Sequence, residues 1–157
     1  MRATALSLRA HILSLFARAL VPALGFLIVC PLQADTHDDV VGLFASMAAA
    51  LSEINVTQFM DAFDKDIPEY GKLKTGVTAL VSQADVSSSV EPLSDDGDET
   101  HRTVELDWYL EIKSILPDGP VVRRREVVRC ELRKEKNHWK IVALQPIEFF
   151  TAAKLDR

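Results

Sequence analysis

The residues that could carry chemistry in this chain begin with Arg124 and Glu126, which interrupt an otherwise apolar strand pattern. Side chains two positions apart in a strand lie on the same face, so the two charged groups would be close enough to pair. An ion pair in an apolar cavity is typical of a small-molecule site. The alternative is that both residues lie at the open end of the sheet, beside the turn at Pro117, and reach water with their charged ends.

Four aromatic residues could line the same cavity, and one acid could stand at its mouth. These pocket candidates are Phe59, Phe63, Tyr70, Trp108 and Asp64. Aromatic residues at helical or strand spacing also form ordinary core. The pattern therefore predicts either a lined pocket or a filled interior.

An isomerase or a cyclase would need a general base inside the cavity. Besides Asp64, only Asp61 and Glu69 lie near its expected mouth. A carboxylic acid and a tyrosine that share one oxyanion would make an isomerase site. Asp107 and Tyr109, the strand residues of these types, alternate onto the water-facing side. The sequence therefore assigns no catalytic residue.

No metal site or cofactor is expected from the remaining reactive side chains. Histidines 37, 101 and 138 have neither metal-ligand spacing nor an acid at a fixed distance in an apolar phase, and the acids of 95–99 lack the spacing of a calcium loop. Cys130 lies in the apolar phase of a strand, where a free cysteine behaves as a small hydrophobic residue. The other cysteine, Cys30, lies in the N-terminal segment, so no intrachain disulfide is expected.

Three strands must position these residues, and we expect them at 104–112, 121–134 and 138–144. Strict alternation of apolar and polar residues indicates one buried and one wet face. Even-numbered apolar residues pair only across an odd-length loop, so we expect a three- or five-residue loop, with Trp108 opposite Val128 or Cys130. Gly119 is the expected residue of positive φ in that loop. The third strand is expected to bury Trp139, Ile141 and Ala143.

The residues before these strands are predicted to form three helices and a short strand. The first helix starts at Asp38, the second is capped by Asn55 with Gln58 in a capping box, and the third starts at 66–69 with Pro68 in its first turn. A strand at 86–91 is expected to end at Pro92, followed by a polar loop over 93–100. Asn55 also begins a glycosylation sequon, which the cap explains without a glycan.

Residues 1–34 have the features of a secretory signal peptide, which leaves a single domain at 35–157. Three arginines precede a short apolar run that ends before a small residue, Ala34. Cleavage there changes the formal net charge from −5 to −8, because three arginines and no acids are removed. We therefore expect an exported protein, periplasmic or secreted, that binds neither nucleic acid nor, once cleaved, a membrane. The alternative is a membrane tether formed by the uncleaved segment.

The order of these elements resembles the nuclear-transport-factor-2-like superfamily, which includes ketosteroid isomerases and polyketide cyclases of the SnoaL type. The most specific local match is Asn137–Ile141, which is similar to the closing strand of many members. The resemblance implies an α+β fold with three N-terminal helices packed on a curved antiparallel sheet of about four strands, a cone-shaped, cystatin-like roll. Members use the space inside the cone as a ligand pocket, an active site or plain core, so the fold leaves the function open.

Two functions remain. The first is a non-catalytic exported module that binds a small apolar ligand or a protein partner, including a second copy through the outer sheet face. The alternative is a small-molecule isomerase, cyclase or lyase with Asp64 or Glu126 as base and Arg124 stabilising negative charge. Because no catalytic constellation lies on an inward face, the non-catalytic function is favoured.

Overall fold

The computed structural model describes residues 32–154 of the chain, and the predicted signal peptide lies almost wholly outside this range. Its elements are α1 (Leu32–Ser52), α2 (Val56–Asp61), α3 (Tyr70–Gln83), β1 (Ala84–Gly97), β2 (His101–Ser114), β3 (Val121–Glu135), β4 (His138–Gln145) and the 3-10 helix η1 (Ile147–Phe150). None of the helices in the described range is long and apolar enough to cross a membrane.

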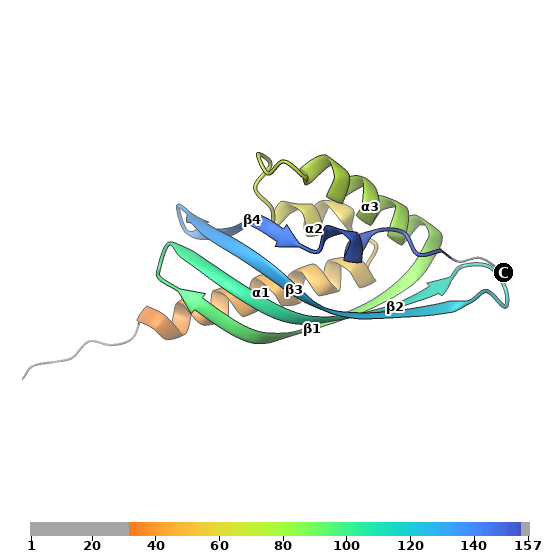
Figure 1. The fold of residues 1–157 in the computed structure, drawn as a ribbon, viewed down its shortest axis with the longest axis horizontal. Coiled ribbons are helices and arrows are strands. Elements are labelled where there is room, and N and C mark those ends of the chain that lie inside the picture. The colour runs from red at the N-terminus through yellow and green to blue at the C-terminus, as the bar shows by residue number, and fades with distance from the viewer. Residues whose placement is uncertain (1–31, 155–157) are drawn as a thin grey trace, which may run out of the picture.

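The four strands form one antiparallel sheet in the order β1-β2-β3-β4. The sheet bends around the helices, so that α1, α2 and α3 cover its concave face (Figure 1). This arrangement confirms the predicted α+β cone. The shape follows from the alternation in β2, whose inward residues are fully buried while the outward ones stay partly exposed.

The register between β2 and β3 pairs residues of equal parity, but it is shifted from the predicted partners. Val104 lies opposite Cys130 and Leu106 opposite Val128, whereas Trp108 lies opposite Glu126. The predicted partner of Trp108, Val128 or Cys130, was therefore wrong: the actual partner lies at least two residues earlier in β3. Parity alone sets which face a residue occupies, and the position of the loop along the chain sets the partner.

The prediction of a three- or five-residue loop between β2 and β3 is confirmed, and the position of that loop along the chain decides the partners. The Ser114 amide donates to the Pro120 carbonyl at 3.0 Å, so the pair encloses the five residues 115–119. Asp118 has the positive φ, 56°, that was predicted for Gly119. Glycine is still required at 119, because a Cβ there would lie 2.4 Å from the Cβ of Ser114.

β1 is much longer than the predicted strand, and Pro92 does not end it. The register shifts between Pro92 and Ser94, so Leu93 is an extra, bulged residue and pairing continues to Gly97. A proline is tolerated there because β1 is an edge strand with a partner on one side only. The predicted loop over 93–100 is reduced to the three residues between β1 and β2.

The helix boundaries also differ in part from the prediction. α1 starts at Leu32, before the expected Asp38, and α3 starts at Tyr70, after the expected 66–69. The cap at Asn55 is confirmed: its Oδ1 accepts from the Gln58 amide at 3.1 Å, and its Nδ2 donates to the Gln58 side chain at 3.0 Å.

A second bulge changes which residues of β4 face inward. The register between β3 and β4 shifts at Glu131/Leu132, which leaves Val142 without a partner on β3. Leu144 is consequently buried and Ala143 is only half-buried, contrary to the prediction. The main chain of Ala62–Asp64 bonds to both sides of Ile141 and covers the outer edge of β4 there.

Candidate functional site

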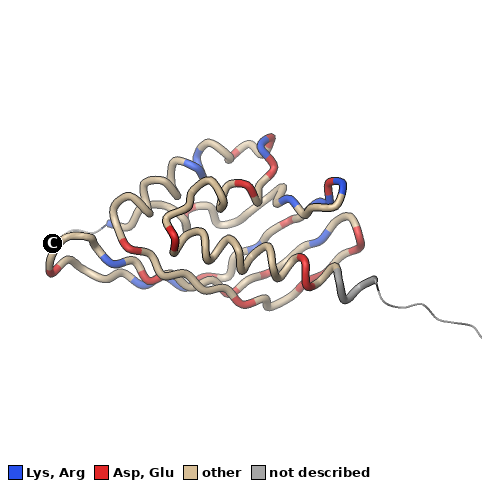
Figure 2. Tube along the Cα trace, turned by 180° about the vertical axis from the view of Figure 1, so that it is seen from behind, with Lys and Arg blue, Asp and Glu red and all other residues tan. Residues whose placement is uncertain are grey.

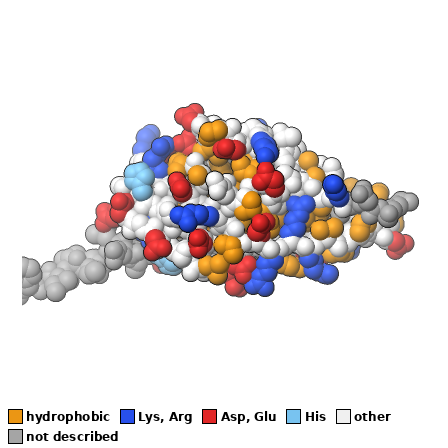
Figure 3. Space-filling model, viewed as in Figure 1, with side chains coloured by type: hydrophobic (Ala, Val, Ile, Leu, Met, Phe, Trp, Pro, Cys, Tyr) orange, Lys and Arg blue, Asp and Glu red, His pale blue; other side chains and the backbone are white. Residues whose placement is uncertain are grey.

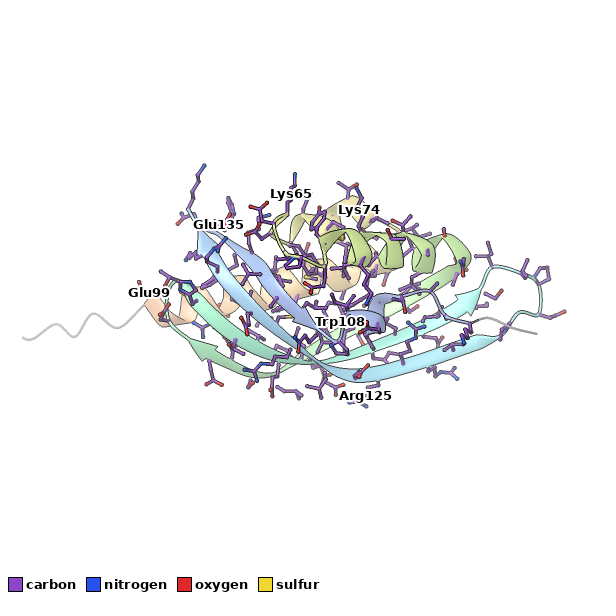
Figure 4. The ribbon with its side chains drawn as sticks, turned by 45° about the horizontal axis from the view of Figure 1, so that its top comes forward. Lys65, Lys74, Glu99, Trp108, Arg125 and Glu135 are labelled. Atoms are coloured by element: carbon purple, nitrogen blue, oxygen red, sulfur yellow. The ribbon has the colours of Figure 1, made fainter. Side chains whose placement is uncertain are left out.

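The interior of the cone is filled by aromatic rings. Phe59, Phe63 and Trp108 are at most 2% exposed. Phe150 returns from the end of the chain to lie between them, with ring centres 5.3 Å from Phe59 and 4.9 Å from Trp108. Figure 4 shows Trp108 directed into the space between sheet and helices. Three of the predicted pocket aromatics thus form the core, and Tyr70 packs half-buried against it.

Arg124 is bound to the C-terminal segment. Its guanidinium donates to the main-chain carbonyls of Phe149, Thr151 and Ala152 at 2.8, 2.6 and 3.2 Å. Burial lowers the pKa of this guanidinium. Arg124 therefore holds the segment that carries Phe150 into the core.

Glu126 is exposed, although it lies in the inward phase of β3. The reason is the length of β4, which pairs only with Arg129–Glu135 and leaves the first half of β3 without a neighbour on that side. The sequence left two interpretations of Arg124 and Glu126, a polar spot in a cavity or side chains that reach water. The side chain of Glu126 reaches water.

Asp64 lies half-buried beyond the end of α2. Its Oδ2 accepts from Arg133 at 2.6 Å, and its Oδ1 accepts from the Asp66 amide at 2.9 Å. It lines a shallow pocket of about 280 Å³ together with Arg133 and Val142. Thr36 and Ser114 are the polar residues of the described range that are buried as whole residues. One carboxylate in that range is also largely buried: the side chain of Asp95 is 7% exposed and pairs with His37 at 2.7 Å and with Arg102 at 2.5 Å, a contact of histidine and acid that the sequence did not indicate.

The outer face of the sheet pairs acids of β2 with arginines of β3. Asp107 pairs with Arg125 at 2.5 Å, and Glu111 pairs with Arg123 at 2.8 Å. These bonds lower the pKa of Asp107 and raise the pKa values of both arginines. Arg125 points away from the helices (Figure 4), and basic and acidic residues are interspersed over the strands (Figure 2).

Cys130 is buried, and burial raises the pKa of its thiol. A thiol held in its neutral form is a poor nucleophile, which agrees with the structural role expected from its strand phase. Within residues 32–154, no group of three or more His, Cys, Asp or Glu side chains is placed to hold a metal ion.

The structure adds a groove that the sequence did not indicate. This α1–α2–β4 groove has a volume of about 420 Å³ and lies between the middle of α1, the end of α2 and the start of β4. Its lining residues are Asp39, Leu43, Ser46, Met47, Gln58, Asp61, Ala62, Asn137, His138, Trp139 and Lys140. They come from three distant segments, so no periodicity in the sequence could have joined them.

The floor of the groove is apolar and its rim is polar. Met47, Ala62 and Trp139 are at most 5% exposed. The Lys140 ammonium group donates to the main-chain carbonyl of Asp61 and so connects β4 to α2. On the side seen in Figure 3, hydrophobic side chains are interspersed with charged ones.

One groove residue, Trp139, has an unsatisfied polar atom. The indole N–H of Trp139 has no hydrogen-bond partner, and it is the only buried side-chain N or O in the described range of which this is true. The ammonium group of Lys134 lies over the ring, 5.5 Å from its centre. The indole of Trp108, by contrast, donates to Ser88 at 2.9 Å.

Comparison with known proteins places the fold. No family model matches the sequence, and no curated protein matches it. A nuclear-transport-factor-2-like superfamily protein from Salmonella enterica has a similar structure, with a TM-score of 0.59 and 10% identity over 78% of this chain and 95% of that one.

Two further solved structures share the arrangement. The hexachlorocyclohexane dehydrochlorinase LinA-type3 from Novosphingobium barchaimii has a TM-score of 0.57 at 11% identity, over 71% of this chain and 84% of that one. A protein with a cystatin-like fold from Nostoc punctiforme has a TM-score of 0.54 at 18% identity, over 73% of this chain and 92% of that one. At these identities the likeness is one of fold: the described chain has the nuclear-transport-factor-2-like fold.

Proposed function

We propose that this protein is an exported, non-catalytic binding domain that takes its ligand in the α1–α2–β4 groove and not inside the cone. The filled interior is the observation that carries the proposal. A site inside the cone would need free space beside an acid or base, and the space is occupied by Phe59, Phe63, Trp108 and Phe150.

The groove has the composition of a ligand site. It combines an apolar floor with a small number of polar groups on its rim, and its volume of about 420 Å³ suits a small organic molecule. The rim lies on three separate elements that are packed together, so its geometry exists before a ligand arrives.

The alternative function is a small-molecule isomerase, cyclase or lyase that uses a carboxylate. In its favour, the same fold occurs in a protein named as a dehydrochlorinase. Against it, Asp64 is bound to Arg133, Glu126 is exposed, and Arg124 is occupied by three main-chain carbonyls. The non-catalytic function therefore has the stronger support.

A fragment screen followed by two-dimensional NMR of the folded protein tests the proposal. We expect fragments to perturb the amides of Leu43, Met47 and Ala62, and Ser46→Trp to abolish these changes, because an indole on the exposed rim would fill the groove. Ser82→Trp, at an exposed position of α3, is the matched control and should leave binding unchanged.

Two results would contradict the proposal. Perturbation confined to Phe59 and Trp108 would show an accessible interior and favour the enzyme. A complete lack of perturbation by the fragments would remove the small-ligand function.

A further inference from the structure

We propose that the ligand of the α1–α2–β4 groove presents an uncharged oxygen acceptor, such as the carbonyl of a ketone, ester or amide, to the indole N–H of Trp139. This inference rests on the proposed function. It adds the chemical class of the ligand and the atom that recognises it.

The first step is the unpaired donor. Trp139 is 5% exposed, and its Nε1 has no partner. Burial of a donor without an acceptor costs folding free energy, so nearly all such groups in folded proteins are paired. The indole N–H of Trp108 is paired in this way, because it donates to the Ser88 hydroxyl. An unpaired donor beside a groove is explained if a ligand supplies the acceptor.

The second step is the direction of approach. Lys134 lies over the face of the Trp139 ring, 5.5 Å from its centre, while the N–H points outward in the plane of the ring. An acceptor must therefore arrive at the edge of the ring. Nε1 has almost no exposed surface, so a small local movement must expose it to the oxygen as the ligand binds.

The third step is charge. Two carboxylates, Asp39 and Asp61, and one lysine, Lys140, line the groove. The lysine ammonium group already donates to the main-chain carbonyl of Asp61. An anionic ligand would thus meet a net negative lining, whereas a neutral carbonyl would not. Leu43, Met47 and Ala62 provide the apolar surface for the rest of the ligand.

Three probes of similar size separate these properties on the wild-type protein. Acetophenone carries a neutral carbonyl on an apolar ring, ethylbenzene lacks the oxygen, and benzoate carries a negative charge. The chain has two tryptophans, so the two indole N–H resonances are resolved reporters. We expect acetophenone to move the Trp139 proton downfield and leave the Trp108 proton in place, with a smaller or no effect from ethylbenzene and benzoate.

Equal shifts from acetophenone and ethylbenzene would overturn the hydrogen bond. An equal or larger shift from benzoate would overturn the neutral-ligand assignment.

A variant tests the same donor by affinity. Trp139→Phe retains an aromatic ring but lacks the N–H, and we expect acetophenone to bind about twofold to tenfold more weakly, the range of one hydrogen bond. Tyr109→Phe, which removes a hydroxyl on the outer sheet face, is the control and should bind like the wild type. Melting temperatures establish that both variants fold.

The outcomes distinguish this inference from the proposed function. If Ser46→Trp abolishes acetophenone binding and Trp139→Phe does not weaken it, the groove is the site and the role of Trp139 is wrong. If neither variant affects binding, both proposals fail.

Discussion

Two neighbouring arginines show how far the surroundings of a residue decide its role. Arg124 lies inward, half-buried, and donates to three carbonyls of the C-terminal segment. Arg125 lies outward, 69% exposed at its side chain, and pairs with Asp107. An exposed ion pair contributes little to stability, whereas a charged donor that satisfies partly buried carbonyls contributes more.

We therefore expect Arg124→Met to destabilise the protein by about 1–3 kcal/mol, because the carbonyls of Phe149, Thr151 and Ala152 would lose their donor. Urea unfolding measures the change, and carboxypeptidase digestion should reach further into the C-terminal segment. Arg125→Met is the matched control and should leave both readouts nearly unchanged. Equal losses for the two variants would contradict the role assigned to Arg124.

At the scale of elements, β1 and the turn that follows it depend on local chemistry. Gly97 has φ = 145°, and a Cβ there would lie 2.2 Å from the His101 carbonyl. The Asp98 carboxylate accepts from the amides of Thr100 and His101 and from the Thr100 hydroxyl at 2.7–2.8 Å. These residues close the β1–β2 hairpin in three residues and allow β1 to extend past Pro92.

The Asp98 carboxylate makes this hairpin sensitive to acid. Its hydrogen bonds from Thr100 and His101 lower the pKa of Asp98 from 3.8 to about 2. A lowered pKa in the folded state means that the stabilisation is complete above about pH 4 and is lost as the pH falls towards 2. We expect the wild type to exceed Asp98→Asn in unfolding free energy above pH 4 and to approach it near pH 2.

Urea unfolding at a series of pH values measures this difference. Asp96→Asn, on the exposed end of β1, is the control for the loss of one negative charge. A difference between wild type and Asp98→Asn that stays constant from pH 5 to pH 2 would exclude the carboxylate as the source.

At the scale of the whole molecule, the cone is closed around its own aromatic residues, and the groove lies outside that core. The C-terminal segment is responsible, because it brings Phe150 against Phe59 and Trp108. The described domain starts with α1 at Leu32, so the predicted cleavage after Ala34 would remove only the first residues of that helix.

We propose export on the sequence of residues 1–34, and it can be measured directly. Expression of the full chain in a Gram-negative host should give a periplasmic protein whose mass corresponds to a start at Asp35. Leu27→Arg should interrupt the apolar run and retain the protein in the cytoplasm. A full-length chain in the membrane fraction would instead support the tether.

The sequence by itself determined the fold class and which residues of β2 and β3 face inward. Alternation over 104–112 and the helical stripes of α1 and α3 are local patterns, and burial of one face follows from them directly. The cap at Asn55 and the parity of the β2–β3 register are equally local, because they involve residues close in the chain or the length of one loop.

Only the tertiary structure decided whether the cone is a pocket or a core, and where a ligand could bind. Phe150 fills the interior, and Arg124 holds it there, although the two residues lie on separate elements. The bulges at Leu93 and Val142 change which residues of β1 and β4 face inward, and the local sequence does not require either bulge. The groove joins residues of α1, α2 and β4 through packing of distant segments, and the unpaired donor of Trp139 exists only in that packing.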